Sequence, residues 1–268
     1  MHVTFFTIVL DGMPFIKRIY PELRKLDFPW TWVVIEGVAR PSHCTKWCAT
    51  IPAGLSTDGT TEYLAEIDEL DSRVIWRGSP AWDGKVAMVN QACAVAQPGL
   101  LWEIDSDEFW TAEQIQKMVR LFRDNPERDC AYFWCRYFVG PDIVITSRDT
   151  YGNFSSYEWL RVWRFEPGQR FLTHEPPRLE RSQKAPFVHA ETEALGLIFD
   201  HHAYATEKQL AFKERYYGSE ANPNGWKYKG AVANWRRLQA NTQWPVKELK
   251  ALLPWVGDGV VAERIKAP

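Results

Sequence analysis

The sequence predicts an α/β fold in which a mostly parallel sheet carries helices on both faces. One observation is that short apolar runs alternate with amphipathic segments through the first half of the chain, as in β-α-β units. Another is the apolar run 100–104, which ends abruptly in acidic residues, as a buried strand does when it delivers carboxylates to its carboxyl end. With 268 residues, 46% of them apolar and 25% charged, the chain can bury a full core as one large domain.

The first half yields five strands and four helical segments in regular order. Apolar runs predict strands at 5–10, 32–36, 73–76, 100–104 and 131–138. Amphipathic segments between them predict helices at 14–26, 60–70 and 84–96. A further helix is expected after Thr111, because residues 111–114 have the form of a capping box and the apolar residues that follow recur at helical spacing.

The second half follows a different pattern from about residue 142 onward. Longer strand-like or irregular stretches, rich in aromatic and basic residues, occur at 158–165 and 197–204. A clear helix is predicted from Thr206, where Gln209 completes a second capping box and Gly218 marks the expected end. A loop at 222–225, rich in Pro, Asn and Gly, leads into more helix.

Composition excludes several classes of protein. The formal net charge of -2 gives no global basic field, so broad nonspecific binding of nucleic acid is not expected. Five cysteines without a repeating pair argue against a disulfide framework or a structural zinc site and favour a reducing cytoplasm. No secretion signal and no run near the ~20 apolar residues of a membrane span is found. We therefore expect a cytoplasmic protein without a transmembrane segment.

Three carboxylates, Asp105, Asp107 and Glu108, follow the strand predicted at 100–104. Ligands of open α/β sheets bind outside the carboxyl ends of the strands, and clustered carboxylates there suit a hard divalent cation that carries a phosphorylated ligand. Such residues are also common in turns and caps, and Glu108 can instead support the start of the following helix. The cluster alone leaves both interpretations open.

The wider order of motifs resembles that of the GT-A glycosyltransferases, and of family 2 in particular. Trp82-Asp83-Gly84-Lys85 precedes the acidic strand and is followed by Asn90 on the same predicted helix; Gly84 allows close backbone approach to a ligand, and Lys85 offers a charge to phosphate. The resemblance extends over residues 5–217 through further motifs in the same order: 160–165, His174-Glu175, His201-His202-Ala203-Tyr204 and Lys213-x-Arg215-Tyr216.

This resemblance implies a single GT-A domain over 1–268, with a nucleotide-sugar-binding half at 1–140 and an acceptor-side half at 141–268. It implies a metal-dependent, hexosyltransferase-type enzyme that transfers a sugar from a nucleotide-sugar donor, UDP-sugar favoured, with inversion. The bound cation, Mn²⁺ or Mg²⁺, would stabilise the charge that develops on the leaving nucleoside diphosphate. The acceptor stays open between a saccharide, a lipid-linked saccharide, a peptide and a nucleic-acid base.

The resemblance also gives each metal-site residue an expected role. Asp105 faces the ribose or the metal, and Asp107 is a direct ligand. His201 is the expected third ligand, because a neutral imidazole can complete such a shell. His202 competes with it, since Ala203 stands where the family usually has Gly. Alternatively, both histidines are simply hydrogen-bonded near a strand end.

Donor contacts are expected from Asp11 and Glu36, which follow the first two strands and can reach the base and ribose. Both can equally be turn residues. Trp82, Asp83, Lys85, Asn90 and Asp105 complete the expected donor site. Trp82 and Trp110 flank it, with core packing as the alternative role.

The resemblance implies that Glu175 is the catalytic base, a group that must lie within hydrogen-bond reach of the acceptor nucleophile. Its rival interpretation is a buried salt bridge to Arg161 or Arg164. Two other functions are the alternatives to sugar transfer. A sugar-phosphate nucleotidyltransferase is disfavoured because no glycine-rich nucleotide loop with a basic residue follows the first strand. A catalytically silent nucleotide-sugar-binding protein is disfavoured by the presence of Asp105, Asp107 and Glu175.

Overall fold

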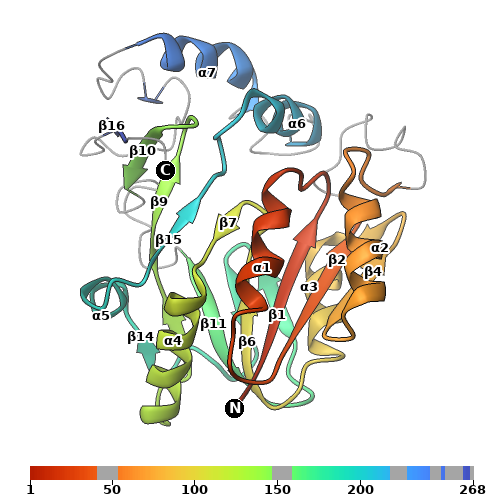
Figure 1. Cartoon of the computed structure of the whole chain (residues 1–268), viewed down its shortest axis with the longest axis vertical. Coiled ribbons are helices and arrows are strands. Elements are labelled where there is room, and N and C mark those ends of the chain that lie inside the picture. The colour runs from red at the N-terminus through yellow and green to blue at the C-terminus, as the bar shows by residue number, and fades with distance from the viewer. Residues whose placement is uncertain (41–53, 147–158, 218–227, 242–248, 251–261, 266–268) are drawn as a thin grey trace.

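The computed structural model of the chain describes residues 1–40, 54–146, 159–217, 228–241, 249–250 and 262–265. Its centre is a seven-stranded sheet in the order β14-β8-β11-β6-β1-β2-β4 (Figure 1). The four strands that end this order, from β6 to β4, pair in parallel, whereas β11 is antiparallel to both of its neighbours. The strands are β1 (His2–Val9), β2 (Trp30–Glu36), β4 (Val74–Gly78), β6 (Gly99–Glu103), β8 (Cys130–Tyr132), β11 (Leu160–Phe165) and β14 (Pro186–Phe187).

Helices cover both faces of this sheet, as the sequence predicts, because successive strand side chains point to opposite faces. On one face Phe5 and Trp32 belong to a core shared with η1 (Phe15–Arg18), α1 (Ile19–Leu23), α2 (Thr60–Leu70) and α4 (Ala112–Asp124). On the other face Phe6 and Val33 pack with α3 (Gly84–Cys93). The mostly parallel α/β architecture is therefore confirmed.

A second sheet, in the order β16-β10-β9-β15-β7, joins distant parts of the chain. Its strand β15 runs parallel to β9 and antiparallel to β7, which places His201 opposite Glu108. The sequence predicts one strand at 131–138, but the structure interrupts it at Phe133, so that β8 belongs to the large sheet and β9 to the second. The strands are β7 (Glu108–Phe109), β9 (Trp134–Phe138), β10 (Ile143–Thr146), β15 (Ile198–His201) and β16 (Ala262–Arg264).

Smaller elements surround the carboxyl ends of the parallel strands. A two-stranded hairpin is formed by β12 (Phe171–His174) and β13 (Pro177–Leu179), and β3 (Ala39–Arg40) pairs with β5 (Trp82–Asp83). The parallel strands point toward the end of the molecule that carries α6 (Glu207–Tyr217) and α7 (Ala231–Ala240), and α5 (His189–Ala194) lies beside the second sheet (Figure 1). Within the described residues, no helix combines the length and apolar character needed to cross a bilayer.

The helix boundaries follow the sequence signals closely where caps are present. The predicted helix at 60–70 is observed at Thr60–Leu70, and both capping boxes form, with Thr206 and Gln209 bonding each other's backbone N–H groups at 3.0 and 3.3 Å. The predicted helix at 84–96 ends at Cys93. The segment at 14–26 contains only a 3-10 turn and a five-residue helix. The expected end at Gly218 lies outside the described residues.

Replacing Thr111 by alanine is expected to lower the free energy of unfolding by about 1 kcal/mol, because the Thr111 hydroxyl accepts the Gln114 N–H at 3.2 Å. Urea denaturation followed by circular dichroism measures this change. Thr111→Ser, which keeps the hydroxyl, should retain most of the stability. If Thr111→Ala were as stable as the wild type, the capping box would not contribute to stability.

Candidate metal and nucleotide site

The loop between β6 and β7 carries the acidic residues predicted from the sequence. It is held at both ends by backbone bonds: the Ile104 N–H donates to the Phe6 carbonyl at 2.9 Å, and the Glu108 N–H donates to the Asp105 carbonyl at 2.9 Å. The Thr7 hydroxyl also donates to the Ile104 carbonyl at 2.6 Å. The loop is thereby fixed to β1 at the carboxyl end of the sheet.

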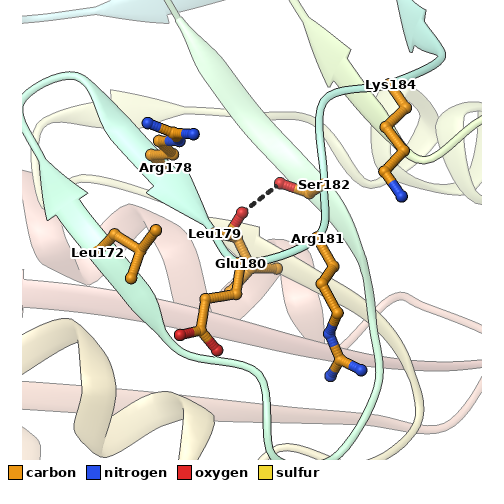
Figure 2. Close-up of a pocket in the computed structure, with 7 residues that line it drawn as sticks. All are labelled: Leu172, Arg178, Leu179, Glu180, Arg181, Ser182 and Lys184. Carbon is orange, nitrogen blue, oxygen red and sulfur yellow. Dashed lines mark hydrogen bonds between the residues drawn. The ribbon is translucent and has the colours of Figure 1, made fainter.

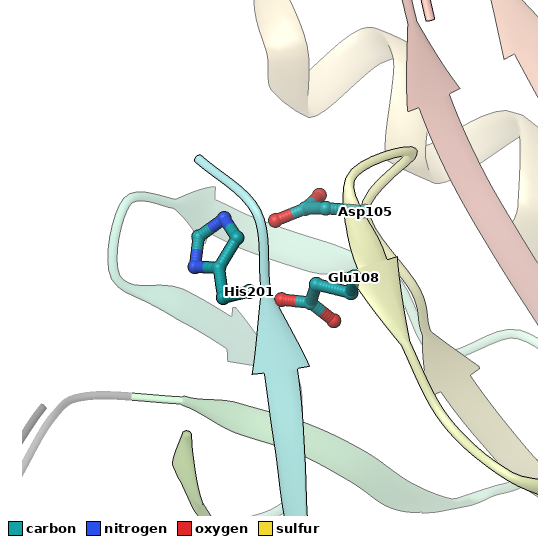
Figure 3. A group of neighbouring side chains, drawn as sticks. All are labelled: Asp105, Glu108 and His201. Carbon is teal, nitrogen blue, oxygen red and sulfur yellow. The ribbon is translucent and has the colours of Figure 1, made fainter. Parts of the chain in front are cut away.

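Asp105, Glu108 and His201 come together at this edge, each with a ligand atom within 4.8 Å of those of the other two (Figure 3). The two carboxylates come from the end of β6 and from β7, whereas His201 ends β15 and reaches them through the pairing of β15 with β7. Asp107 adjoins the group, with its Oδ1 3.4 Å from His201 Nε2. The other ring nitrogen of His201, Nδ1, is buried without a hydrogen-bond partner among the described residues.

A buried arginine, Arg161 of β11, neutralises part of this negative charge. Its guanidinium donates to Glu108 at 2.6 and 2.8 Å and to Asp105 at 2.8 Å, and lies 3.5 Å from Glu103. Glu103 also contacts His174 Nε2 at 2.8 Å. The sequence suggests Arg161 only as a possible partner of Glu175, so its role beside Glu108 and Asp105 was not predicted. Its one signal was a charged residue inside the apolar run 160–165.

Acidic groups outnumber the fixed cations in this cluster. Burial raises the pKa of Glu108 to about 7, against the opposing effect of Arg161, and burial likewise raises the pKa of Asp105. Burial also acts to raise the pKa of Asp107, but the neighbouring His201 outweighs it and holds that pKa below its usual range. A site with this surplus of buried carboxylates suits a bound cation.

His202 has a different environment from His201. Its ring stacks on Phe15 at 5.1 Å and on Phe138 at 4.1 Å between ring centroids, and its Nε2 lies 2.8 Å from a guanidinium nitrogen of Arg18. Because arginine only donates, Nε2 is the acceptor. Burial, aided by Arg18, lowers the pKa of His202 to about 4. Of the two histidines, His201 lies with the carboxylates, whereas the His202 ring packs between phenylalanines and its Nε2 is already bonded to Arg18.

Glu36 and Asp11 hold the segment that precedes α2. The buried Glu36 carboxylate accepts hydrogen bonds from the Ser56 N–H at 3.0 Å, the Thr61 hydroxyl at 2.6 Å and Trp76 Nε1 at 2.9 Å. Asp11, which has a φ of 56°, accepts the Thr57 N–H at 2.7 Å. These contacts match the interpretation of Glu36 and Asp11 as turn residues. The carboxylate oxygens that were expected to bind the donor instead bond neighbouring parts of the chain.

The residues at the start of α3 divide between scaffold and site. Trp82 donates from Nε1 to the Glu36 carbonyl at 2.9 Å, and Asp83 occupies the N-cap position without a side-chain cap bond. The Lys85 ammonium contacts the Glu175 carboxylate and lies 5.4 Å from the centroid of the Tyr217 ring. The expectation for Asn90 changes: its side-chain amide bonds the Phe171 N–H and carbonyl at 2.8 and 3.1 Å, so it ties α3 to β12.

Glu175 lies in the turn of the β12–β13 hairpin with 57% of its side chain exposed. Its partner is Lys85, so the rival interpretation of a buried bridge to Arg161 or Arg164 is wrong. The Arg164 guanidinium instead donates to backbone carbonyls, including that of Asn125 at 3.0 Å. Trp110, which sequence analysis placed beside the donor, is a core residue that stacks on Phe199 at 4.6 Å.

Part of the chain is similar in sequence to known glycosyltransferases. Residues 54–181 match the model of glycosyl transferase family 2. This segment contains Lys85, Asp105, Asp107, Arg161 and Glu175, whereas His201 lies beyond it. Over 124 residues, the chain is 26% identical to the putative teichuronic acid biosynthesis glycosyltransferase TuaG of Bacillus subtilis (strain 168). The match covers 46% of this chain and 47% of that protein, so the chain spans about half the length of this curated relative.

Solved structures with a similar course of the chain include two complexes with nucleotide sugars. The mannosyltransferase PcManGT from Pyrobaculum calidifontis, in complex with GDP-Man and Mn²⁺, gives a TM-score of 0.49 at 14% identity, over 94% of this chain and 68% of that one. S. aureus TarS 1-349 in complex with UDP-GlcNAc gives a TM-score of 0.47 at 12% identity, over 96% of this chain and 80% of that one.

Proposed function

From the match of residues 54–181 to glycosyl transferase family 2, we propose that this chain is a metal-dependent glycosyltransferase that uses a nucleotide-sugar donor, with UDP-sugars favoured. The observation that supports this proposal most directly is the meeting of Asp105, Glu108 and His201, with Asp107 beside them, at the carboxyl edge of the sheet. Open α/β sheets bind their ligands at this edge.

The residues present fit a divalent cation. Carboxylate oxygens with one imidazole form a set of ligands that suits Mn²⁺. Mg²⁺ would bind mainly to the carboxylate oxygens of the same set. Asp105, Asp107 and His201 would hold the ion, and the surplus of buried carboxylates around Arg161 favours a positive charge there. When bound, the ion would stabilise the charge that develops on the departing nucleoside diphosphate.

Lys85 and Glu175 have separate roles in the proposed reaction: Lys85 binds the donor phosphate, and Glu175 accepts the proton of the acceptor. Burial acts to lower the pKa of Lys85, but the neighbouring Tyr217 and Glu175 outweigh it, so Lys85 stays a cation that can turn to a donor phosphate. The exposed Glu175 carboxylate takes the proton of the acceptor nucleophile as the nucleophile bonds to the sugar carbon. The bond from that carbon to the diphosphate breaks on the opposite side, and the sugar is transferred with inversion.

Glu175→Gln is expected to lower kcat by about 10²- to 10⁴-fold, because glutamine cannot accept the proton. Donor binding should be retained, because Glu175 lies outside the carboxylate cluster and its replacement by glutamine leaves the Lys85 ammonium charged and able to meet the donor phosphate. Steady-state kinetics together with calorimetric nucleotide titration separate the two effects. Glu166→Gln, the same change at an exposed position before the hairpin, is the matched control. Equal loss of donor binding and turnover would contradict the proposed role.

Calorimetric titration with UDP, GDP, CDP and dTDP, each with and without Mn²⁺, tests the function itself. One nucleotide should bind tightly, and only when the metal is present. That result would also identify the donor base. If none of the four bound under either condition, the proposed function would be wrong.

We also propose a cytoplasmic location. Its support is that Cys93 and the buried Cys130 are free thiols in the described part of the chain. Thiols of this kind are typical of reducing compartments.

A further inference from the structure

A shallow hollow lies on the β12–β13 hairpin and the segment that follows it. It has a volume of about 480 Å³ and is lined by Leu172, Arg178, Arg181, Ser182 and Lys184, among others (Figure 2). This volume lies in the range of sites for small ligands. The hollow shares none of its lining residues with the carboxylate cluster.

Three cationic side chains surround this hollow. Arg178, Arg181 and Lys184 make no side-chain hydrogen bond or ion pair with the residues that the structure describes. Most other arginines of the described chain are paired, including Arg73 with Asp71 at 2.7 Å and Arg136 with Asp200 at 2.5 Å. The surplus is therefore local, in a chain whose formal net charge is -2.

The one carboxylate at this hollow does not neutralise the three cations. Glu180 Oε1 already accepts a hydrogen bond from Arg170 Nε at 3.1 Å. Positive charge that is gathered around a concave surface attracts anionic ligands. The exposed Leu172, with 47% of its surface accessible, adds an apolar contact beside these charges.

The backbone that carries these cations is held in place. The Asp129 carboxylate accepts the N–H groups of Lys184 and Ala185 at 2.7 and 3.0 Å, and the Ser182 hydroxyl donates to the Leu179 carbonyl at 2.8 Å. Arg181 has a φ of 59°, in the left-handed region, which this bonding maintains. A preformed backbone lowers the ordering cost of binding.

The hairpin connects the hollow to Glu175. In the pairing of β12 with β13, His174 lies opposite Pro177 and Thr173 opposite Arg178, so Arg178 is three residues beyond Glu175 on the strand that leaves the turn. Because Glu175 lies in the turn itself, this stretch of chain is shorter than the about 10 Å that three extended residues span. A short oligomeric ligand can therefore occupy the hollow while its end reaches Glu175.

We propose that this hollow binds the acidic groups of a carboxylated saccharide acceptor. The proposal rests on the proposed glycosyltransferase function, in which Glu175 faces the acceptor. Arg178 and Arg181 can bind carboxylates with two parallel hydrogen bonds each, and Lys184 adds a point charge. Leu172 contacts the apolar face of a sugar ring.

The test is a calorimetric titration with tetragalacturonate, a linear acidic tetrasaccharide, and with maltotetraose as its neutral match. The test variant is Arg178→Gln/Arg181→Asn/Lys184→Gln, with asparagine at 181 because it tolerates the left-handed backbone. The control is Lys25→Gln/Arg120→Gln/Arg123→Gln, which removes the same charge from exposed positions on α4 and after α1. Arg178→Glu alone provides a second test if the triple variant unfolds.

Tetragalacturonate should bind the wild type and the control with equal affinity. It should bind the triple variant and Arg178→Glu at least ~10-fold more weakly. Raised salt should weaken its binding to the wild type. Wild-type affinity in these variants, equal loss in the control, or no binding to the wild type would overturn the proposal. So would a single-stranded oligonucleotide binding the hollow in place of the saccharide. Titration of the same samples with UDP and Mn²⁺ reports separately on the proposed function, because the hollow lies outside the carboxylate cluster.

Discussion

Replacing Asp107 by alanine is expected to remove metal-dependent nucleotide binding and to lower sugar transfer by about 10³-fold or more. Asp107 Oδ1 lies 3.4 Å from His201 Nε2, and its carboxyl has a pKa below the usual range, so it is charged at neutral pH. A bound cation contributes several kcal/mol to stabilising a leaving diphosphate, and each 1.36 kcal/mol corresponds to about a tenfold change in rate. Titration of the variant with UDP in the presence of Mn²⁺ measures the first effect, and initial rates measure the second.

The matched control for this experiment is Asp124→Ala at the end of α4. The Asp124 side chain is 62% exposed and contacts its neighbour Arg123 at 3.1 Å. It is not part of the carboxylate cluster. Its removal should leave both nucleotide affinity and rate at wild-type values. If Asp107→Ala bound UDP and Mn²⁺ as tightly as the wild type, Asp107 would not be a metal ligand.

Arg161→Met is expected to lower the free energy of unfolding by about 3–5 kcal/mol. Methionine keeps most of the side-chain volume, but Glu103 and Glu108, which are 2% and 0% exposed, lose their cation and remain buried. Breaking a buried ion pair from one side is costly because the remaining charge stays desolvated. Urea denaturation in a buffer that contains a chelator measures this effect on the metal-free protein.

Arg136→Met provides the comparison for an exposed ion pair. The Arg136 guanidinium bonds Asp200 at 2.5 and 2.7 Å, but 54% of its side chain is exposed. Exposed pairs contribute about 0–1 kcal/mol, so this variant should be nearly as stable as the wild type. A loss in Arg161→Met no larger than that in Arg136→Met would mean that the carboxylates do not depend on the buried guanidinium.

Local signals in the sequence were sufficient for much of the fold. The helix at Thr60–Leu70 and the helix after Thr111 follow from apolar spacing and caps, which depend only on residues a few positions apart. The break at Phe133 could not be predicted in this way. Both flanking segments are apolar and strand-like, and only the pairing of β8 with β11 and of β9 with β10 separates them.

The acidic residues of the candidate site could be predicted from the sequence, but the residues that bond them could not. Asp105 and Asp107 follow directly from an apolar run that ends in carboxylates. Arg161 lies 56 residues beyond Asp105 in sequence, and no local pattern connects the two. Asn90 has a residue type that suits a ligand, yet its amide forms two bonds to Phe171, which is 81 positions away. Partners this far apart in sequence are determined by tertiary packing, which local sequence patterns do not report.

The pairing of β15 with β7 makes the imidazole at the carboxylate cluster tolerant of one kind of sequence error. A one-residue slip in a strand brings the next residue to each position. Deleting one residue before β15 would bring His202 opposite Glu108 in place of His201, so an imidazole would still face the acids. Inserting one residue would bring Asp200 there instead and add a carboxylate to a group already rich in them. The doubled histidine therefore keeps an imidazole at the acids after a deletion, but the same slip would bring Asp200 to the buried position of Phe199 and weaken the strand.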